Sequence, residues 1–519
     1  MSSGPASEGS LEPAYPARRA GVLGPVALVV LVGLATVVGG VLTGDVLVTL
    51  TPAVGALVVW AMIRSPLRWQ VAILLFLCLA LEVAGDASDI VHTPLLFPGM
   101  LLMDTSGAAL KVKVAGGELL AFFLIGLALH RRMARSTIDG RGFVPMPSAT
   151  RDVLLVYAVG FVYTVGMSYA TGHGLPPWKA RYLIHFVLFF ALFHLSLRDL
   201  PDFRAMGRAV IAAAHVKAFL AMWVQYSAAP RLTGGELAFA TNHGDSILFV
   251  MAIAIAVIPA LEGTSRRAWR RALWTVPIPF WGVLLNHRRI AYAMLELGFV
   301  LVYLYSPWNR WKKRFTTVAI FGAPLLIAYL ALGWNSNGGG IFAPVHKVRT
   351  MVDGSVDPST YWRDVEAWNI ASTLRDRSPL GVGLGGEYVE YMFNDDISAG
   401  YADFRGWPHN TVLGMLLYAG VPGFALLWIP NLLIVFFAVR SYRMARTADE
   451  RAAALIAIVS FSCCAILSWG DTGAHFWQHK LAMGLTLALV GKLAIRTGAW
   501  PQRAAAAPAV SAQDAAAPG

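Results

Sequence analysis

The sequence is poor in charged residues and in cysteine. Asp, Glu, Lys and Arg make up 14% of its 519 residues, against about a quarter in typical soluble domains. Its three cysteines, Cys78, Cys463 and Cys464, all lie inside apolar runs. They predict small buried side chains and exclude a disulfide framework. The sequence also has no H-E-x-x-H motif and no Cys/His metal spacing, so neither a metal site nor a cofactor is predicted.

Apolar residues, by contrast, make up 57% of the chain. They form many runs close to the length of about 20 residues that spans a bilayer as a helix. We therefore predict an all-α polytopic membrane protein with about 14 transmembrane helices. The candidate spans are 21–42, 46–63, 69–84, 115–130, 152–171, 181–197, 208–229, 244–262, 272–286, 289–306, 317–334, 411–439, 452–469 and 480–496. Within 411–439, a break is expected at Pro422-Gly423.

The net charge of +12 is concentrated in every second loop between these runs. Cytoplasmic loops of membrane proteins carry an excess of Lys and Arg, so the charge indicates orientation and does not predict a nucleic-acid partner. Both termini are predicted to be cytoplasmic. The basic groups of the inner loops are Arg64/Arg68, Arg131/Arg132/Arg135/Arg141, Arg198/Arg204/Arg208, Arg266/Arg267/Arg270/Arg271, Arg310/Lys312/Lys313/Arg314 and Arg440/Arg443/Arg446/Arg451.

The predicted organisation has five parts. A cytoplasmic tail (1–20) precedes helices 1–11 (21–334), a large outer loop (335–410), helices 12–14 (411–496) and a disordered Ala/Pro-rich tail (497–519). No signal-peptide cleavage pattern lies near the first span, which is expected to be retained. A second outer loop covers 85–114. Within the large loop, apolar spacing over 360–376 predicts an amphipathic helix at the membrane surface; the alternative is a loop that covers helix ends.

Cationic and polar residues begin several helices on the predicted outer face. A helix N-terminus attracts anions and disfavours cations, so cations in this place predict a bound anion, and arginine suits phosphate in particular. The residues concerned are Arg181, Asn242, His243, His287, Arg288, Arg289, His409 and Asn410, which Arg349, Arg363, Arg375 and Arg377 of the large loop could join.

Each candidate also has an ordinary structural interpretation. Arg181 could extend to a lipid headgroup, and Asn410 could cap its helix. His409 could be a hydrogen-bonded interfacial histidine. Arg363 could pair with Glu366 on the same helix.

Two ionisable residues lie inside predicted spans. Lys217 and Glu296 are costly in a bilayer and need partners, which predicts either a structural Lys217–Glu296 pair or a proton relay typical of a transporter. A G-x-G-x-x-G pattern at 381–386 has no strand before it and no βαβ unit around it, so it does not predict a dinucleotide site.

Four segments carry a family resemblance. Y-W-R-x-x-E-A-W-N-I begins at Tyr361, S-P-L-G-V-G-L-G-G at Ser378 and H-N-T-V-L-G-M-L-L-Y-A-G-V-P-G at His409, where the large loop ends; N-H-R-R-I-A-Y-A occupies 286–293. Taken together, these four segments resemble the O-antigen ligase/polymerase superfamily of bacterial membrane glycosyltransferases. Either Arg288 or Arg289 resembles that family's outer-face arginine, with Arg289 favoured, and Arg181 resembles a further one.

The resemblance implies a GT-C-like arrangement and a polyprenyl-diphosphate-linked oligosaccharide as donor, used at the periplasmic face of the inner membrane without metal. Arginines would hold the diphosphate, His409 would act as base, and aromatic residues of the loop, including Trp362 and Trp407, would stack on sugars. We expect a polymerase that joins glycan repeats; the alternative is a ligase with lipid A-core as acceptor. The lipid bilayer and other polysaccharide-assembly proteins are further partners. The rivals from other classes are a lipid-linked sugar transporter and a non-catalytic assembly protein.

Overall fold

A computed structural model describes most of the chain beyond residue 66. The described residues are 60, 64–81, 101–104, 113–139, 148–173, 181–232, 237, 239–263, 265–336, 340–342, 345, 346, 349, 358–393 and 404–500. The chain divides into two units, Met1–Pro66 and Leu67–Gly519, and the account below concerns the second. The predicted span 21–42, nearly all of 46–63 and both terminal tails except 497–500 lie outside the described residues.

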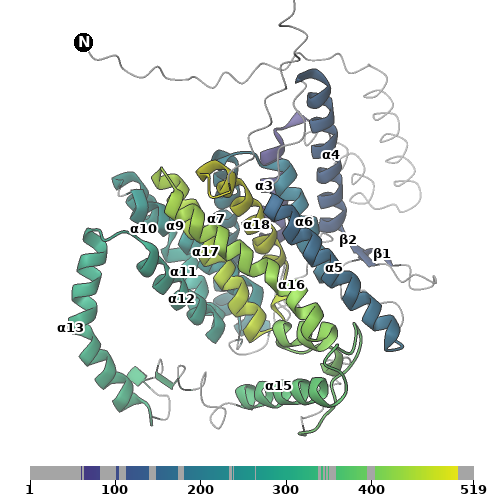
Figure 1. Ribbon diagram of the computed structural model, residues 1–519. Helices are drawn as coiled ribbons and strands as arrows, with labels where there is room; N and C mark the ends of the chain where they lie inside the picture. The colour runs from purple at the N-terminus through teal and green to yellow at the C-terminus, as the bar shows by residue number, and fades with distance from the viewer. Residues whose placement is uncertain are drawn as a thin grey trace, which may run out of the picture. The chain divides into compact units, whose positions relative to one another are not determined.

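The described chain is almost entirely helical (Figure 1), which confirms the predicted all-α class. Its two strands, β1 (Leu101–Asp104) and β2 (Lys113–Ala115), form one short antiparallel pair at the end of the predicted outer loop 85–114. The helices are α3 (Leu67–Ala80), α4 (Gly116–Asp139), α5 (Ser148–Ala170), α6 (Tyr182–Ser196), α7 (Leu200–Trp223), the π-helical turn η3 (Val224–Ala228), α8 (Ala229–Leu232), α9 (His243–Gly263), α10 (Arg266–Thr275), α11 (Pro277–Asn286), α12 (Arg289–Tyr305), α13 (Arg310–Gly333), the 3-10 turn η4 (Gly340–Phe342), α15 (Pro358–Asp376), η5 (Phe404–Gly406), α16 (Thr411–Met444), α17 (Ala448–Gly470), η6 (Gly473–His475) and α18 (Trp477–Thr497).

Six of the described stretches are long and apolar enough to cross a membrane: Thr150–Ala170, Leu200–Arg231, His243–Gly263, Arg310–Gly333, Thr411–Met444 and Ala448–Gly470. Each overlaps a predicted span, whereas the total of 14 spans and the GT-C-like arrangement stay predictions. The predicted span 272–286 is divided between α10 and α11, which are separated at Pro277. Each of these two helices has 10 residues, too few to cross a bilayer alone.

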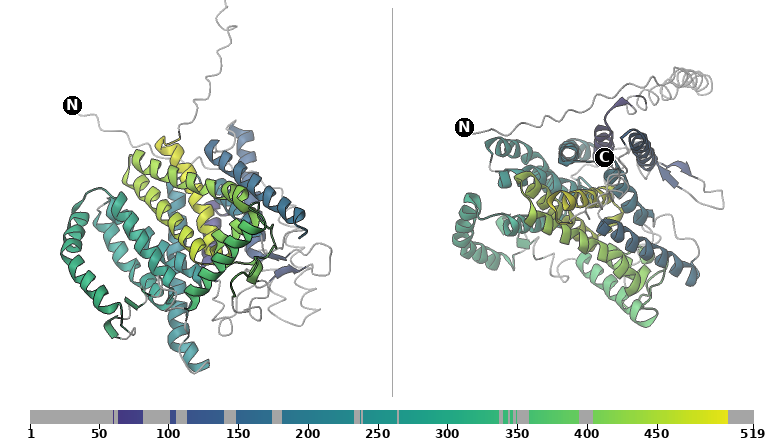
Figure 2. Two further views of the ribbon diagram at one scale, coloured as in Figure 1. Left: turned by 60° about the horizontal axis from the view of Figure 1, so that its bottom comes forward. Right: turned by 45° about the horizontal axis from the view of Figure 1, so that its top comes forward.

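Helices α17 and α18 lie in the middle of the packed helices (Figures 1 and 2). Helix α17 packs against α9, α12, α16 and α18, and α18 packs against α6. Phe189 of α6 and Trp477 of α18 are buried and meet edge to face with ring centroids 5.4 Å apart. Helix α16 runs beside α5, where Gly160 leaves no room for a Cβ against Leu426. This packing holds the starts of α6, α16 and α18 together.

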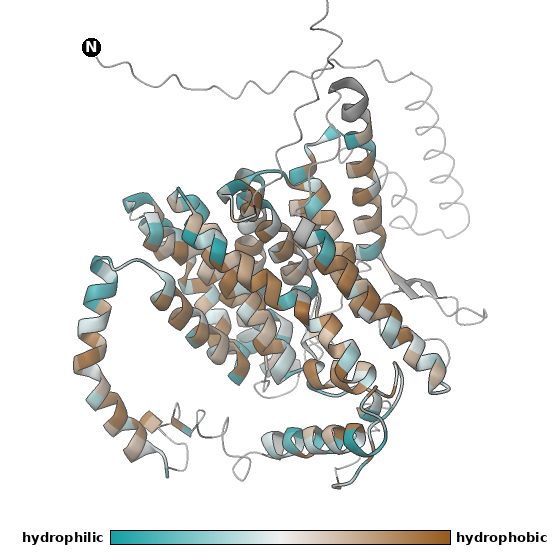
Figure 3. Cartoon of the chain, viewed as in Figure 1, coloured by the Kyte–Doolittle hydropathy of each residue, from teal (hydrophilic) through white to brown (hydrophobic). Residues whose placement is uncertain are grey.

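Helix α13 presents apolar side chains on its surface (Figure 3). None of its most apolar 18-residue window is buried within the protein, and Phe321 and Leu325 are 76% and 74% exposed. Exposed apolar surface of this extent is typical of a helix that faces lipid. The Asn309 side chain caps its N-terminus through the Lys312 N–H.

The glycine-rich turn 381–386 attaches the large loop to α16. Val382 and Gly383 donate their N–H groups to the carbonyl oxygens of Leu417 and Tyr418 on α16, at 2.9 and 3.0 Å. Gly420, with φ of +60°, interrupts the helical backbone of α16 here, two residues before the Pro422-Gly423 position predicted for a break. A Cβ on Gly420 would lie 2.2 Å from the Leu380 carbonyl carbon. The backbone of the turn is therefore in direct contact with the backbone of α16, which supports the rejection of a dinucleotide site.

Helix α15 confirms that the chain is helical over 360–376, but its apolar side chains are not gathered on one face, so the predicted amphipathic character is not borne out. Val365, Ile370 and Leu374 are buried as expected, whereas Trp368 is 54% exposed. Its C-terminal half is joined to the segment that follows it, because Asn369 Oδ1 accepts from the N–H groups of Tyr391 and Met392. One hydrophobic cluster links α15 with α6, the glycine-rich turn and α16. Its placement at a membrane surface stays a prediction.

Candidate functional site

The ends of six helices meet around Asp471. The carboxylate of Asp471, which follows α17, contacts His243 at the start of α9, and its carbonyl oxygen accepts from the Thr411 N–H at the start of α16. A Cβ on Gly470 would press against Ile290, which places the start of α12 at the same point. The ends of α11 and α18 are joined to α9 by two side-chain hydrogen bonds, Asn286 to Ser246 and Gln478 to Asp245. Helix starts far apart in sequence are therefore neighbours, as the sequence predicts for an outer-face site.

His409 is held by Glu366 of α15. The Glu366 carboxylate accepts the His409 backbone N–H at 3.0 Å, and its other oxygen lies 3.4 Å from His409 Nδ1. Glu366 is 3% exposed. The hydrogen bond and charge of Glu366 raise the pKa of His409 above its ordinary value, against the opposing effect of burial. This arrangement fixes the ring and turns its second nitrogen, Nε2, away from Glu366, as in a positioned general base.

A second histidine–carboxylate pair lies beside the first. His243 Nδ1 is 2.5 Å from the Asp471 carboxylate. Burial tends to raise the pKa of Asp471, but the hydrogen bond and charge of His243 outweigh it and hold that pKa below its ordinary value. The charges of Asp471 and Arg363 also act on His409, and Arg363 acts on Asp471. The structure thus brings together three predicted site residues, His409, His243 and Arg363.

Three rings cover one side of this cluster. Trp407 meets His475 edge to face with centroids 4.7 Å apart, and Tyr182 lies 4.5 Å from His475 and 6.1 Å from Trp407. Trp407 is half-buried, so part of its ring surface is accessible. Tyr418 donates to the Gly406 carbonyl oxygen and fixes the loop that carries Trp407. The three rings come from α6 and from the segments before α16 and α18, and they form a surface suited to stacking.

Arg181 directly precedes α6, next to Tyr182. Its Nε lies 3.2 Å from Glu118 Oε1 of α4, and the same carboxylate contacts His185 Nε2 at 2.6 Å. The Arg181 side chain is 15% exposed, so it is held within the protein and does not extend freely to a headgroup.

Arg288 and Arg289 stand at the junction of α11 and α12. Between the helices, His287 has φ of +53°, the only positive φ of a non-glycine residue among those described. Backbone in this region is uncommon for an L-residue with a side chain, and it sets the direction in which the chain leaves for Arg288. The Arg288 guanidinium lies over the Phe239 ring, 3.3 Å from its centroid. Arg289 is the first residue of α12 and is half-buried.

The remaining predicted residues have local roles that the structure defines. Asn410 Oδ1 accepts from the N–H groups of Val412 and Leu413 and caps α16, so the capping interpretation is confirmed. Asn242 Oδ1 accepts from the Asp245 N–H in the same way. Trp362 is half-buried on α15. Substrate contacts by these three residues stay predictions.

The predicted Lys217–Glu296 pair is wrong. Lys217 is 1% exposed and its Nζ lies 3.3 Å from Asp245 Oδ2, while Gln478 Nε2 donates to the other oxygen at 3.0 Å. Glu296 lies on an exposed part of α12. The prediction failed because it overlooked Asp245, which lies in the first turn of α9 and just inside the predicted span 244–262.

Sequence reasoning missed the carboxylates of this site. Each of three residues predicted on the outer face, Arg181, His243 and His409, contacts a buried or nearly buried carboxylate, from Glu118, Asp471 and Glu366 respectively. A cation at these helix starts is therefore offset by the protein itself, and a bound anion is not the only explanation for its placement. The available signal was local: Glu366 is three positions after Arg363, and both lie in the quoted Y-W-R-x-x-E motif.

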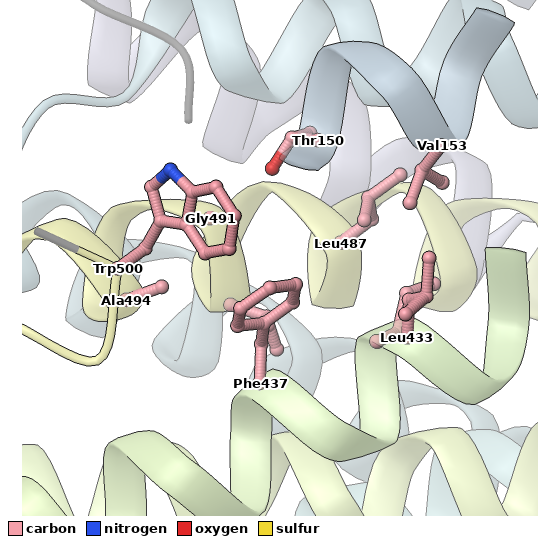
Figure 4. Close-up of a pocket in the computed structure, with 10 residues that line it drawn as sticks. Thr150, Val153, Leu433, Phe437, Leu487, Gly491, Ala494 and Trp500 are labelled. Atoms are coloured by element: carbon pink, nitrogen blue, oxygen red, sulfur yellow. The ribbon is translucent and has the colours of Figure 1, made fainter. Parts of the chain in front are cut away.

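An apolar hollow lies away from this site (Figure 4). It is lined by Thr150 and Val153 of α5, by Leu433, Ile434 and Phe437 of α16, by Leu487, Val490, Gly491 and Ala494 of α18, and by Trp500. It is at the opposite end of α5, α16 and α18 from the histidine pairs. Its lining offers no charged group for catalysis.

One segment of the chain, which runs from α11 through α15 into the first half of α16, matches a known protein family. In the described residues, no three His, Cys, Asp or Glu side chains are grouped as metal ligands. A search of the curated proteins found no match. Residues 274–428 match the model of the O-antigen ligase family, which confirms the resemblance of this chain to the O-antigen ligase/polymerase superfamily.

Proposed function

We propose that this protein is a membrane glycosyltransferase that moves a glycan from a polyprenyl-diphosphate carrier to the hydroxyl group of an acceptor. The observation that carries the proposal is the His409–Glu366 pair, with Arg363 and Asp471 beside it. His409, Glu366 and Arg363 lie inside the segment that matches the O-antigen ligase family. A base next to cations at one cluster of helix ends suits transfer from a diphosphate.

His409 is proposed as the general base. Glu366 faces Nδ1, so Nδ1 carries the proton and Nε2 accepts one from the acceptor hydroxyl. The acceptor oxygen then bonds to the anomeric carbon of the donor sugar. The bond from that carbon to the diphosphate breaks, and its electron pair leaves with the polyprenyl diphosphate. Glu366 stabilises the imidazolium that forms.

The arginines are proposed to stabilise the leaving diphosphate. Arg289 at the start of α12, Arg288 before it and Arg363 on α15 provide guanidinium groups that bind phosphate oxygens in pairs. Arg181 would act at the edge of the site, because Glu118 already takes part of its charge. Charge that grows on the diphosphate as the bond breaks is where such groups lower the barrier.

The aromatic residues are proposed to bind the sugars. Tyr182, Trp407 and His475 form one group of rings beside the histidine pairs. Trp362, Asn242 and His243 would complete the substrate contacts. Stacking on sugar rings positions the acceptor without contributing charge.

Two acceptors fit this chemistry. In polymerisation, the proposal we favour, the hydroxyl belongs to another lipid-linked glycan. In ligation it belongs to lipid A-core, which the description of the matching family as O-antigen ligase favours. The transporter alternative loses the Lys217–Glu296 coupling on which it relied, because Lys217 pairs with Asp245. We place the reaction at the periplasmic face of the inner membrane, with both termini cytoplasmic.

Reconstitution tests the proposal. Full-length protein in liposomes receives a lipid-diphosphate-linked oligosaccharide, with or without lipid A-core, and products are separated by size. Chain growth on the donor alone identifies a polymerase; transfer that needs lipid A-core identifies a ligase. We expect His409→Ala and Arg289→Ala to lose activity. Arg270→Ala is the matched control, since Arg270 is exposed on α10 and is not among the candidate site residues. Full turnover by the His409 and Arg289 variants would refute the assigned roles.

A further inference from the structure

A cavity of about 190 Å³ lies between the start of α7 and the last turns of α18. It is at the end of α18 remote from Trp477, and therefore separate from the histidine pairs. Three cations line it, Arg198, Lys492 and Arg496, against one carboxylate, Asp199. Leu200 and Phe203 are among its apolar walls. A water molecule occupies about 30 Å³ in the liquid, so the cavity has room for a small anionic group.

Lys492 is the group that most needs a partner. Its Nζ is buried and has no hydrogen-bond partner among the residues that the structure describes. The charges of Asp199 and Asp202 act favourably on this ammonium group, but it loses its hydration and receives no hydrogen bond in exchange, which is costly in a folded protein. An anion in the cavity would supply the missing acceptor.

Two nearby carboxylates are bound by other groups. Glu450 accepts from Arg496 Nε at 2.8 Å and caps α17 together with Thr447. Asp202 accepts from the Arg198 backbone N–H at 2.9 Å and lies 3.7 Å from Arg68. Asp202 and Asp199 act on Lys492 by charge, but neither forms a hydrogen bond with its Nζ.

The start of α7 adds to the positive potential. This helix has 24 residues and begins at Leu200, on the cavity wall, with Pro201 in its first turn. Asp199 precedes it, but its side chain makes no capping hydrogen bond. The free N–H groups at this start favour an anion, and Asp202 in the first turn offsets part of their charge.

We propose that this cavity binds a phosphate group through Lys492 Nζ, the Arg198 guanidinium and the start of α7. Arg198 and Asp199 are exposed, so the cavity is accessible from the surface. The phosphate can come from two sources: the headgroup of an anionic phospholipid, whose chains would follow the apolar walls, or a soluble phosphate compound.

Native mass spectrometry of the full-length protein in detergent separates these sources. One arm adds phosphatidylglycerol, the second adds phosphatidylcholine, and the third adds phosphatidylglycerol with excess inorganic phosphate. We expect one phosphatidylglycerol to be retained by the wild type in preference to phosphatidylcholine. Lys492→Gln should weaken its binding about ten-fold, as the loss of a charge-assisted hydrogen bond predicts. Displacement by inorganic phosphate identifies the soluble source, and its failure identifies the lipid.

Two further variants keep the test decisive. Arg198→Gln changes an exposed residue, so it reports on the site even where Lys492→Gln does not fold. Arg270→Gln removes one positive charge from an exposed position on α10 and should leave retention unchanged. Equal retention of phosphatidylglycerol by the wild type and all three variants would overturn the proposal, as would equal retention of phosphatidylcholine.

Discussion

Replacing Glu366 by Gln tests whether the carboxylate acts through His409. A glutamine oxygen still accepts the His409 backbone N–H, now 3.0 Å from Glu366 Oε2, so the loop should keep its position. The negative charge 3.4 Å from His409 Nδ1 is lost. The proton that His409 takes from the acceptor hydroxyl is then less well stabilised.

The size of the effect follows from distance and exposure. Unit charges about 4 Å apart attract by roughly 4 kcal/mol near a protein surface and about 1 kcal/mol in water. The His409 side chain is 37% exposed and that of Glu366 is 4% exposed, so solvent screening reduces the attraction to about 1–2 kcal/mol. We expect kcat for glycan transfer to fall about five- to thirty-fold. His409→Ala should cost more, about 10²–10⁴-fold, because it removes the base itself.

The pH dependence has a definite sign. Glu366 raises the pKa of His409, and only deprotonated His409 acts as a base. Glu366→Gln lowers that pKa, so the acidic limb of the kcat profile should move to lower pH. Because the pKa is raised in the folded protein, the pair stabilises the fold at acidic pH and loses this effect as the pH rises through it. The difference in Tm between the Glu366→Gln variant and the wild type should therefore be largest at acidic pH.

The assay is transfer from a lipid-diphosphate-linked glycan in proteoliposomes, measured between about pH 5 and 9 to cover both limbs. Asp364→Asn, at an exposed position of α15, is the matched control and should change neither rate nor profile. A double-mutant cycle decides the mechanism. If Glu366→Gln lowers the rate as much in the His409→Ala background as in the wild type, the two residues act independently and the reasoning is refuted.

Three further predictions concern stability, each measured as Tm in detergent. Gly420→Ala should destabilise by at least about 1–2 kcal/mol, because φ is +60° and its Cβ would meet the Leu380 carbonyl carbon; Gly166→Ala, with nothing within 4 Å, should be neutral or stabilising, and equal losses would contradict the attachment of the turn 381–386 to α16. His287→Gly should preserve or raise Tm, since it relieves a positive φ; a loss would show that the side chain matters more than the backbone. Lys217→Met should cost about 3–5 kcal/mol by leaving Asp245 buried without its cation, and Asp245→Leu in addition should recover most of it; no recovery would argue against the pair.

Local features of this protein could be predicted from its sequence. The apolar runs, the helix over 360–376 and the cap at Asn410 were predicted because periodicity and capping involve residues within one or two helical turns of each other. The family resemblance was equally accessible, because its motifs are contiguous stretches. The break in α16 was expected two residues from its true position at Gly420, since a Pro-Gly pair signals a turn but does not fix the residue that adopts the positive φ.

Pairings between distant residues were decided by the tertiary structure alone. Glu366 and His409 are 43 residues apart, Glu118 and His185 are 67 apart, and the Ser168 hydroxyl accepts the N–H of Leu384, 216 residues away. Nothing in the spacing of such residues indicates which of them meet, because that depends on how the helices pack. For the same reason the sequence found the outer-face cations and missed the carboxylates that offset their charge. Composition determined that the chain forms membrane helices; packing determined which charges face one another.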